Sequence, residues 1–202
     1  MKTLLYIDSC IRGDISRTKR IANAFLDKFR SNAEYAIETI TIDELATSPL
    51  GRREYERREQ LLAAGQTDDK IFNLPKQFAK ADLIVVSAPF WDMGIPAKLK
   101  IYFENVSVSG LTFGFDGAEF KGLCKANRMV YITTRGMEIE DADVMEQASP
   151  YLIALCKFFG IENFSMVSAS SLDVKPNEVD ERISIAVKQA EVLADGIIRA
   201  DV

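Results

Sequence analysis

One segment, residues 83–115, holds residue types that can bind a flat ligand. It begins as an apolar run, continues into a loop, and then enters an amphipathic helix opened by Pro96. The loop carries the chain's single tryptophan among other aromatic and conformationally special residues: Phe90, Trp91, Asp92, Met93 and Gly94. Aromatic rings can lie against a planar ligand, and a glycine lets the backbone come close. A flavin is a ligand of this kind.

A second candidate is the loop at residues 8–18, DSCIRGDISRT, which follows the first apolar run. Free amides and the helix dipole at the start of the next helix can bind an anion, so a phosphate fits here. Seen alone, such a hydroxyl cluster more often caps the helix, and Arg12 and Arg17 more often face solvent. The loop has neither GxGxxG nor GxxxxGK(S/T), which disfavours a classical dinucleotide fold and a P-loop NTPase. The hydroxyl groups belong to Ser9, Ser16 and Thr18.

A third candidate is Thr133-Thr134-Arg135-Gly136-Met137, at the end of another apolar run. Gly136 would let backbone amides approach the edge of a ligand. Arg135 beside it would favour negative charge on a reduced ring. The alternative is a simple turn between a strand and a helix.

The composition excludes several classes of chemistry. The 202 residues include no histidine, which rules out Ser-His-Asp and Cys-His catalysis and HExxH zinc hydrolysis. The three cysteines, Cys10, Cys124 and Cys156, are far apart and form no CxxC pair, which argues against a disulfide framework and a zinc site. Cys10 stands at a helix N-terminus, which can lower a thiol pKa, although a buried unreactive thiol is the commoner case.

Charge and hydropathy patterning indicate a cytoplasmic protein without a membrane or nucleic-acid partner. The net charge is −5 and the sequence pI is about 5.0, whereas phosphate-backbone binding needs an excess of Lys and Arg. We find no signal-peptide pattern and no apolar run long enough to span a membrane. The charged segment 52–64 has nearly balancing acids and bases, which indicates a solvated helix face.

The spacing of apolar residues predicts the strands and helices that position these loops. Apolar and β-branched runs predict five strands, at residues 2–8, 34–42, 82–88, 128–134 and 164–170. Apolar positions at helical spacing predict a helix with Ser16 as its N-cap and further helices at residues 52–64, 68–80, 96–106, 142–159 and 177–199.

This alternation predicts one α/β domain over residues 1–202, with a doubly wound five-stranded parallel sheet and helices on both faces. In the strand order 2-1-3-4-5, the ends of strands one, three and four meet around the switch point, so the three candidate loops would face one crevice. Residues 110–125, rich in Gly and Phe, are too long for a tight connection. They indicate a functional lid or interface element, or else an irregular covering loop.

The chain resembles the FMN-dependent NADH:azoreductases and related NAD(P)H:quinone oxidoreductases, which have a flavodoxin-like fold. The resemblance runs nearly end to end. Its most specific part is AP followed by four residues, a helix start rich in Pro, Ala, Leu and Lys, and then ENVSVSGLTF. The family's phosphate loop maps onto Ser9 and residues 16–18, and its SRGG loop maps onto residues 134–137. Asp92 stands where Asn is common, and Met137 replaces the second glycine; we expect both to affect substrate range more than fold.

The resemblance implies FMN as cofactor, NADH or NADPH as co-substrate, and a homodimer with flavin sites at the interface. It also implies ping-pong hydride transfer through flavin N5 to a quinone, azo compound or nitroaromatic, with no metal and no assigned catalytic acid or base. The alternatives are a flavodoxin-type electron carrier, which the acidic charge suits, and a flavin-free α/β regulator. The expected cofactor-binding residues are Ser9, Cys10, Ser16, Arg17, Thr18, Pro89, Phe90, Trp91, Asp92, Met93, Thr134, Arg135, Gly136 and Met137.

Overall fold

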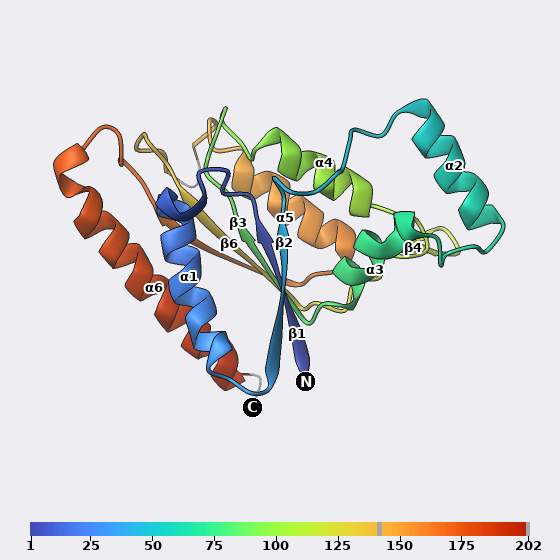
Figure 1. Cartoon of the computed structure of the whole chain (residues 1–202), viewed down its shortest axis with the longest axis horizontal. Coiled ribbons are helices and arrows are strands. Elements are labelled where there is room, and N and C mark those ends of the chain that lie inside the picture. Colours follow the sequence, from blue (N-terminus) through green and yellow to red (C-terminus); the bar gives the residue numbers. More distant parts are fainter. Residues whose placement is uncertain (141–142, 201–202) are drawn as a thin grey trace.

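The computed structural model describes residues 1–140 and 143–200. In this part of the chain, five parallel strands form one sheet in the order β2-β1-β3-β6-β7, and helices cover both faces (Figure 1). Since β6 and β7 are the fourth and fifth strands of the sheet, the predicted order 2-1-3-4-5 is confirmed. The strands are β1 (Lys2–Asp8), β2 (Tyr35–Thr41), β3 (Leu83–Ser87), β6 (Arg128–Thr134) and β7 (Asn163–Ala169).

The helices form a layer on each face of the sheet. On one face, α1 (Arg17–Arg30) packs beside α6 (Val179–Ala200). On the other face lie α3 (Asn73–Lys80), α4 (Ala97–Val106) and α5 (Ala148–Phe159). Side chains of β1 alternate between the two cores, because successive residues of a strand point to opposite faces. Leu5 and Ile7 pack toward α3, α4 and α5, whereas Leu4 and Tyr6 pack toward α1 and α6.

Two helices begin later than their periodicity predicts. The helix predicted from residue 142 begins at Ala148; residues 143–147 are not helical, and Ala142 lies outside the described residues. The helix predicted from residue 68 begins at Asn73, after a short 3-10 turn at Lys70–Phe72. Pro150 and Pro75 explain both differences. Each proline lies in the first turn of the observed helix, where its missing N–H costs nothing, whereas a longer helix would place it in the interior.

Residues 110–125 form neither an irregular loop nor a lid over the candidate loops. They contain an antiparallel hairpin of β4 (Phe113–Asp116) and β5 (Glu119–Gly122). The Phe113 and Phe120 rings pack on Phe158 of α5, with centroids 4.5 and 5.1 Å away. The backbone of Gly122 also approaches Gly160 so closely that no Cβ would fit. The hairpin is therefore fixed at the C-terminal end of α5, away from the carboxyl ends of the strands.

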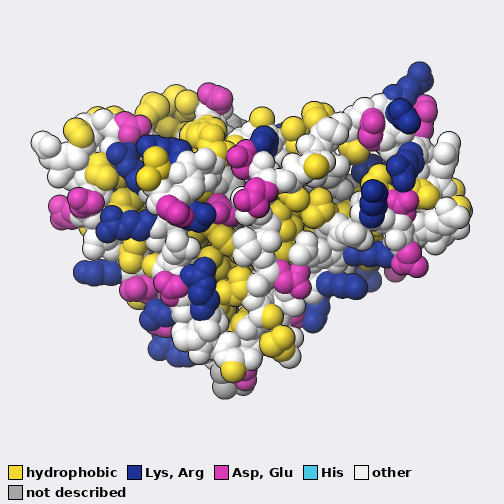
Figure 2. Space-filling view, in the orientation of Figure 1, with side chains coloured by type: hydrophobic (Ala, Val, Ile, Leu, Met, Phe, Trp, Pro, Cys, Tyr) yellow, Lys and Arg dark blue, Asp and Glu magenta, His cyan; other side chains and the backbone are white. Residues whose placement is uncertain are grey.

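The helix α2 (Arg52–Ala63) stands away from the sheet, at the right of Figure 1, and none of its residues is buried. Basic and acidic side chains lie side by side over it in Figure 2, and pairs such as Arg52 with Glu56 are 3.3 Å apart. This is the mixed, solvated face that the sequence predicts. Among the described residues, no helix combines the length and apolar character needed to cross a membrane.

Candidate functional site

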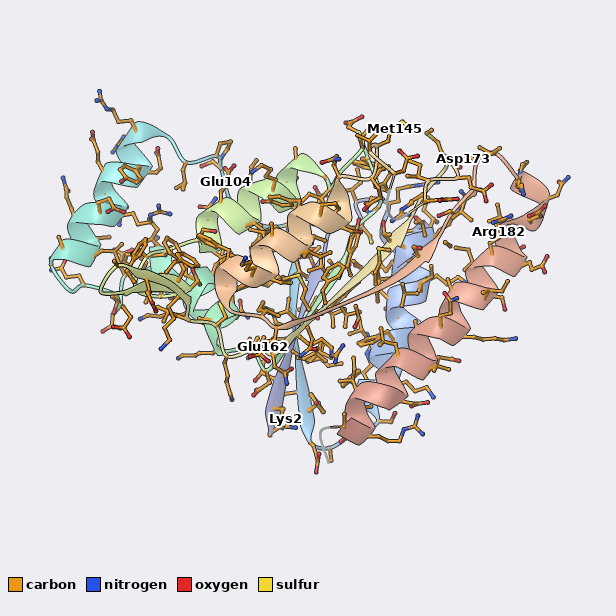
Figure 3. The ribbon with its side chains drawn as sticks, turned by 180° about the vertical axis from the view of Figure 1, so that it is seen from behind. Lys2, Glu104, Met145, Glu162, Asp173 and Arg182 are labelled. Atoms are coloured by element: carbon orange, nitrogen blue, oxygen red, sulfur yellow. The ribbon has the colours of Figure 1, made fainter. Side chains whose placement is uncertain are left out.

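A pocket of about 150 Å³ lies at the carboxyl end of the sheet. Its walls come from the loops after β1, β3, β6 and β7 and from the first turn of α1, so it includes the switch point between β1 and β3. Figure 3 shows this end, where Asp173 and Met145 are labelled, opposite the end marked by Lys2 and Glu162. The lining residues are Cys10, Ile11, Arg12, Ser16, Arg17, Thr18, Pro89, Phe90, Trp91, Thr134, Arg135, Gly136, Leu172 and Asp173.

The first turn of α1 presents hydroxyls and amides to the pocket. Ser16 is the N-cap, as predicted, and its Oγ accepts a hydrogen bond from the Lys19 amide at 3.3 Å. The Thr18 and Thr134 hydroxyls are 2.7 Å apart, which ties α1 to the end of β6. First-turn amides have no acceptor within their own helix, and the helix dipole makes this end positive. An anion can bind here.

Beneath this turn lies a buried polar network around Asp8. The Asp8 Oδ1 accepts a hydrogen bond from the Cys10 amide at 2.9 Å, and its Oδ2 lies 3.2 Å from Lys19 Nζ. The Tyr6 hydroxyl and the Cys10 thiol both meet the Ser87 hydroxyl, at 2.8 and 3.4 Å. Burial raises the pKa of the Cys10 thiol to about 11. Burial therefore favours the protonated thiol of Cys10 over the thiolate.

The aromatic loop after β3 closes in a strained two-residue turn. The Phe90 amide donates to Thr134 O at 3.1 Å, and Trp91 and Gly94 exchange backbone hydrogen bonds of 3.1 and 2.8 Å. Between them, Asp92 and Met93 have φ of 47° and 63°, in the left-handed region. Glycine or asparagine normally fills these positions. The loop's unusual backbone thus lies at Asp92 and Met93 rather than at Gly94, where the sequence suggested it.

Arg135 turns into the protein rather than toward the pocket opening. Its side chain is 1% exposed, its Nη1 donates to Ile139 O at 2.8 Å, and its Nη2 lies 3.7 Å from the Glu146 carboxylate. The guanidinium also lies over the Phe90 ring, 5.6 Å from its centroid. Arg135 nevertheless lines the pocket, and its charge is balanced by Glu146, so its expected effect on the charge of a ligand ring stays a prediction.

A fourth loop, after β7, completes the pocket, and sequence reasoning missed it. Asp173 lies against Gly136, where any Cβ would collide with its carboxylate, and forms a 3.0 Å ion pair with Arg17 of α1. The Asp173 carboxylate thus occupies the place of a Cβ on Gly136, while Gly136 itself lines the pocket. The polar run SSLD after the fifth strand was the available signal, since it ends at the same sheet edge as the other loops.

The sequence matches a family described by its flavodoxin-like fold over residues 2–193. It is 31% identical over 198 residues to an FMN-dependent NADH:quinone oxidoreductase of Coprothermobacter proteolyticus, covering 96% of this chain and 98% of that protein. The chain belongs to this flavodoxin-like oxidoreductase family. A protein of the same description from Clostridium perfringens is 30% identical over 201 residues, which cover 96% of this chain and 98% of the relative.

Solved structures agree on the fold of this flavodoxin-like family. An azoreductase from Bacillus anthracis superposes with a TM-score of 0.86 at 19% identity, over 97% of this chain and all of that one. An FMN-dependent NADH-azoreductase from the same species, described as a complex with FMN, gives a TM-score of 0.82 at 24% identity, over 98% and 99% of the two chains.

The family-based set of expected site residues divides into two groups. Most of them line the pocket: Cys10, Ser16, Arg17, Thr18, Pro89, Phe90, Trp91, Thr134, Arg135 and Gly136. Four do not: Ser9, Asp92, Met93 and Met137. Ser9 is buried just before the pocket, the exposed Asp92 and Met93 form the turn, and Met137 is held through its carbonyl, which accepts from the Ser171 amide at 3.0 Å. Ile11, Arg12, Leu172 and Asp173 are the lining residues that the sequence did not indicate as ligands.

Proposed function

We propose that this protein is an FMN-dependent NAD(P)H oxidoreductase that reduces quinones, azo compounds or nitroaromatics. The observation that carries the proposal is one pocket with two chemically distinct ends. The first turn of α1 offers amides and hydroxyls at one end, and Phe90 and Trp91 offer an aromatic wall at the other. A phosphate joined to a flat ring matches both ends, and FMN has that form.

The residues at the α1 end fit a phosphate. Thr18 and Ser16 present hydroxyls beside the helix N-terminus, and Arg12 lines the pocket without an ion pair to any described residue. Just before the pocket, the buried Ser9 hydroxyl has no hydrogen-bond partner among the described residues. Buried polar groups are almost always paired, so an unpaired one marks a place where a ligand or water completes the structure.

The residues at the β3 end fit a ring. Pro89, Phe90 and Trp91 supply apolar surface, and the Trp91 side chain is 40% exposed, so it is available to cover a bound molecule. When bound in this pocket, FMN would supply the redox chemistry, a ping-pong hydride exchange through its N5 between NAD(P)H and the acceptor. The side chains and amides of the chain itself would bind FMN and orient it. Because burial keeps Cys10 protonated and Arg135 is paired with Glu146, we assign no side chain as a catalytic acid or base.

We propose further that the active form is a homodimer. The pocket within one chain encloses about 150 Å³, whereas ligand pockets usually enclose about 300–1,000 Å³. A second copy would complete the ring end. Exposed apolar side chains of the loops that form and border the pocket are available for such a contact, including Trp91, Met93 and Met137. A reducing cytoplasm suits the three cysteines, which are all unpaired.

A visible spectrum of the purified protein tests the proposal directly. We expect a yellow protein that binds FMN, is bleached anaerobically by NADH or NADPH, and has the mass of a dimer in solution. Steady-state consumption of NADH with a quinone separates the enzyme from an electron carrier, which would show no direct turnover. A colourless protein that takes up no FMN would refute the flavin assignment, and a monomeric mass would refute the dimer.

A further inference from the structure

The segment that begins α5, residues 146–149, holds the aromatic loop at two separate points. We call it the cap segment. At the first point, the Gln147 amide donates to Met93 O at 3.0 Å, in the strained turn. At the second, the Glu146 carboxylate pairs with Arg135, whose guanidinium lies over the Phe90 ring. One short segment, far from the loop in sequence, therefore contacts the end of the loop directly and its start through Arg135.

Glu146 is itself firmly held. Its carboxylate accepts hydrogen bonds from the amides of Ala148 and Ser149, at 3.2 and 3.1 Å, at the start of α5. A negative charge is favourable at this end of a helix. The side chain has no exposed surface, so the carboxylate cannot turn to solvent. Its position is thus fixed by the helix, and the helix is packed into the core through Leu152 and Phe159.

Arg135 connects Glu146 to the Phe90 ring. Its guanidinium is fixed on one side by Ile139 O and on another by Glu146, and its face lies against the Phe90 ring. A guanidinium within about 6 Å of a ring centroid attracts the ring electrostatically, and more strongly where water is excluded. Because Phe90 lines the pocket beside Trp91, fixing its ring fixes part of the pocket wall.

We propose that Glu146 is a positioning residue for the aromatic wall of the pocket, acting through Arg135 on Phe90. The idea that this wall faces a flavin rests on the proposed function, but the positioning of the loop does not. An apolar pair of similar size could fill the same space, and buried ion pairs often contribute little to stability compared with such a pair. An apolar pair would lack the directional contact with Phe90. The ion pair therefore has a role that packing alone does not explain.

The chain's single tryptophan makes the test specific. Trp91 follows Phe90 in the loop, so fluorescence excited selectively at tryptophan, and not at the six tyrosines, reports on this wall, as does its quenching by acrylamide. The variants are Glu146→Gln, which removes the charge, and the double variant Glu146→Leu with Arg135→Met, which removes the pair without leaving a buried charge. Glu56→Gln is the matched control, because its partner Arg52 forms an exposed ion pair on α2. Circular dichroism and thermal melts establish that each variant is folded.

We expect greater acrylamide quenching of Trp91 in both test variants than in wild type, and no change in the control. We expect the FMN dissociation constant of both to rise about three- to tenfold, the factor that one cation–π contact supports. Wild-type quenching in folded test variants, or its restoration by the double variant, would overturn the proposal. If Glu146→Gln does not fold, the double variant decides. If wild type binds no FMN, the proposed function fails, and quenching alone still decides the positioning role.

Discussion

The Asp173 carboxylate occupies the space in which a side chain at Gly136 would begin. A Cβ on Gly136 would lie 3.0 Å from Asp173 Cγ and closer still to its Oδ2. Asp173 in turn pairs with Arg17, so the β6 loop, the β7 loop and the first turn of α1 are packed through one carboxylate. This contact links the expected phosphate end of the pocket to the expected ring end.

Replacing Gly136 with alanine should displace Asp173 and break its ion pair with Arg17. Overpacking of this kind typically lowers the free energy of unfolding by about 1–3 kcal/mol. We expect a loss near the lower limit because the Asp173 side chain can move aside. Urea unfolding measures it. Gly94→Ala is the control, since nothing lies within 4 Å of a Cβ there. Equal stabilities for the two variants would contradict the close approach of Asp173.

Replacing Asp173 with asparagine should tighten FMN binding. Asp173 is the one carboxylate among the described residues that line the pocket, and it occupies Arg17. Removing the Asp173 charge takes away repulsion of the phosphate and leaves Arg17 available to bind it. We expect the affinity for FMN to rise about fivefold. Riboflavin, which lacks the phosphate, should bind unchanged. Asp180→Asn is the control, since Asp180 pairs with Arg20 on α1 instead. Weaker FMN binding to the Asp173 variant would show that the ion pair instead holds Arg17 ready for the ligand.

The sequence predicted the sheet well because the central strands β1, β3 and β6 are buried on both faces and so read as continuous apolar runs, while β-branched residues mark the edge strand β2. It predicted three of the four pocket loops for the same reason, since each follows such a run. It could not predict the direction of Arg135, because that depends on Glu146, a residue brought near only by the packing of α5. Nor did periodicity fix the start of α5, where Pro150 and the Glu146 cap overrule the apolar pattern.

Replacing Met93 with glycine should stabilise the protein. Met93 has φ of 63°, a conformation that costs a residue with a Cβ about 1–2 kcal/mol. Glycine removes that cost but loses more entropy on folding, so we expect a net gain of about 1 kcal/mol. Asp92→Gly should gain less, because Asp tolerates the left-handed region better than Met. Urea unfolding of the two variants gives the comparison; a larger gain at position 92 would refute the strain at Met93.

Stability should fall as the pH rises above about 8.5, the usual pKa of an unfolded thiol. Burial raises the pKa of Cys10 to about 11, and that of Cys124 and Cys156 to about 12. Between these pH values the unfolded chain releases thiol protons that the folded chain retains. The free energy of unfolding therefore falls with each unit by which the pH rises.

For Cys10 the loss should approach about 1.4 kcal/mol per pH unit. Urea unfolding at pH 7, 8.5 and 10 measures the slope. The interval stays below the range in which the buried tyrosines, whose pKa values are also raised, would contribute strongly. Cys10→Ala should have a shallower slope than wild type over the same interval, because it removes one of the titrating thiols. An unchanged slope would mean that Cys10 ionises in the folded protein as readily as in the unfolded chain, and would contradict the raised pKa of this thiol.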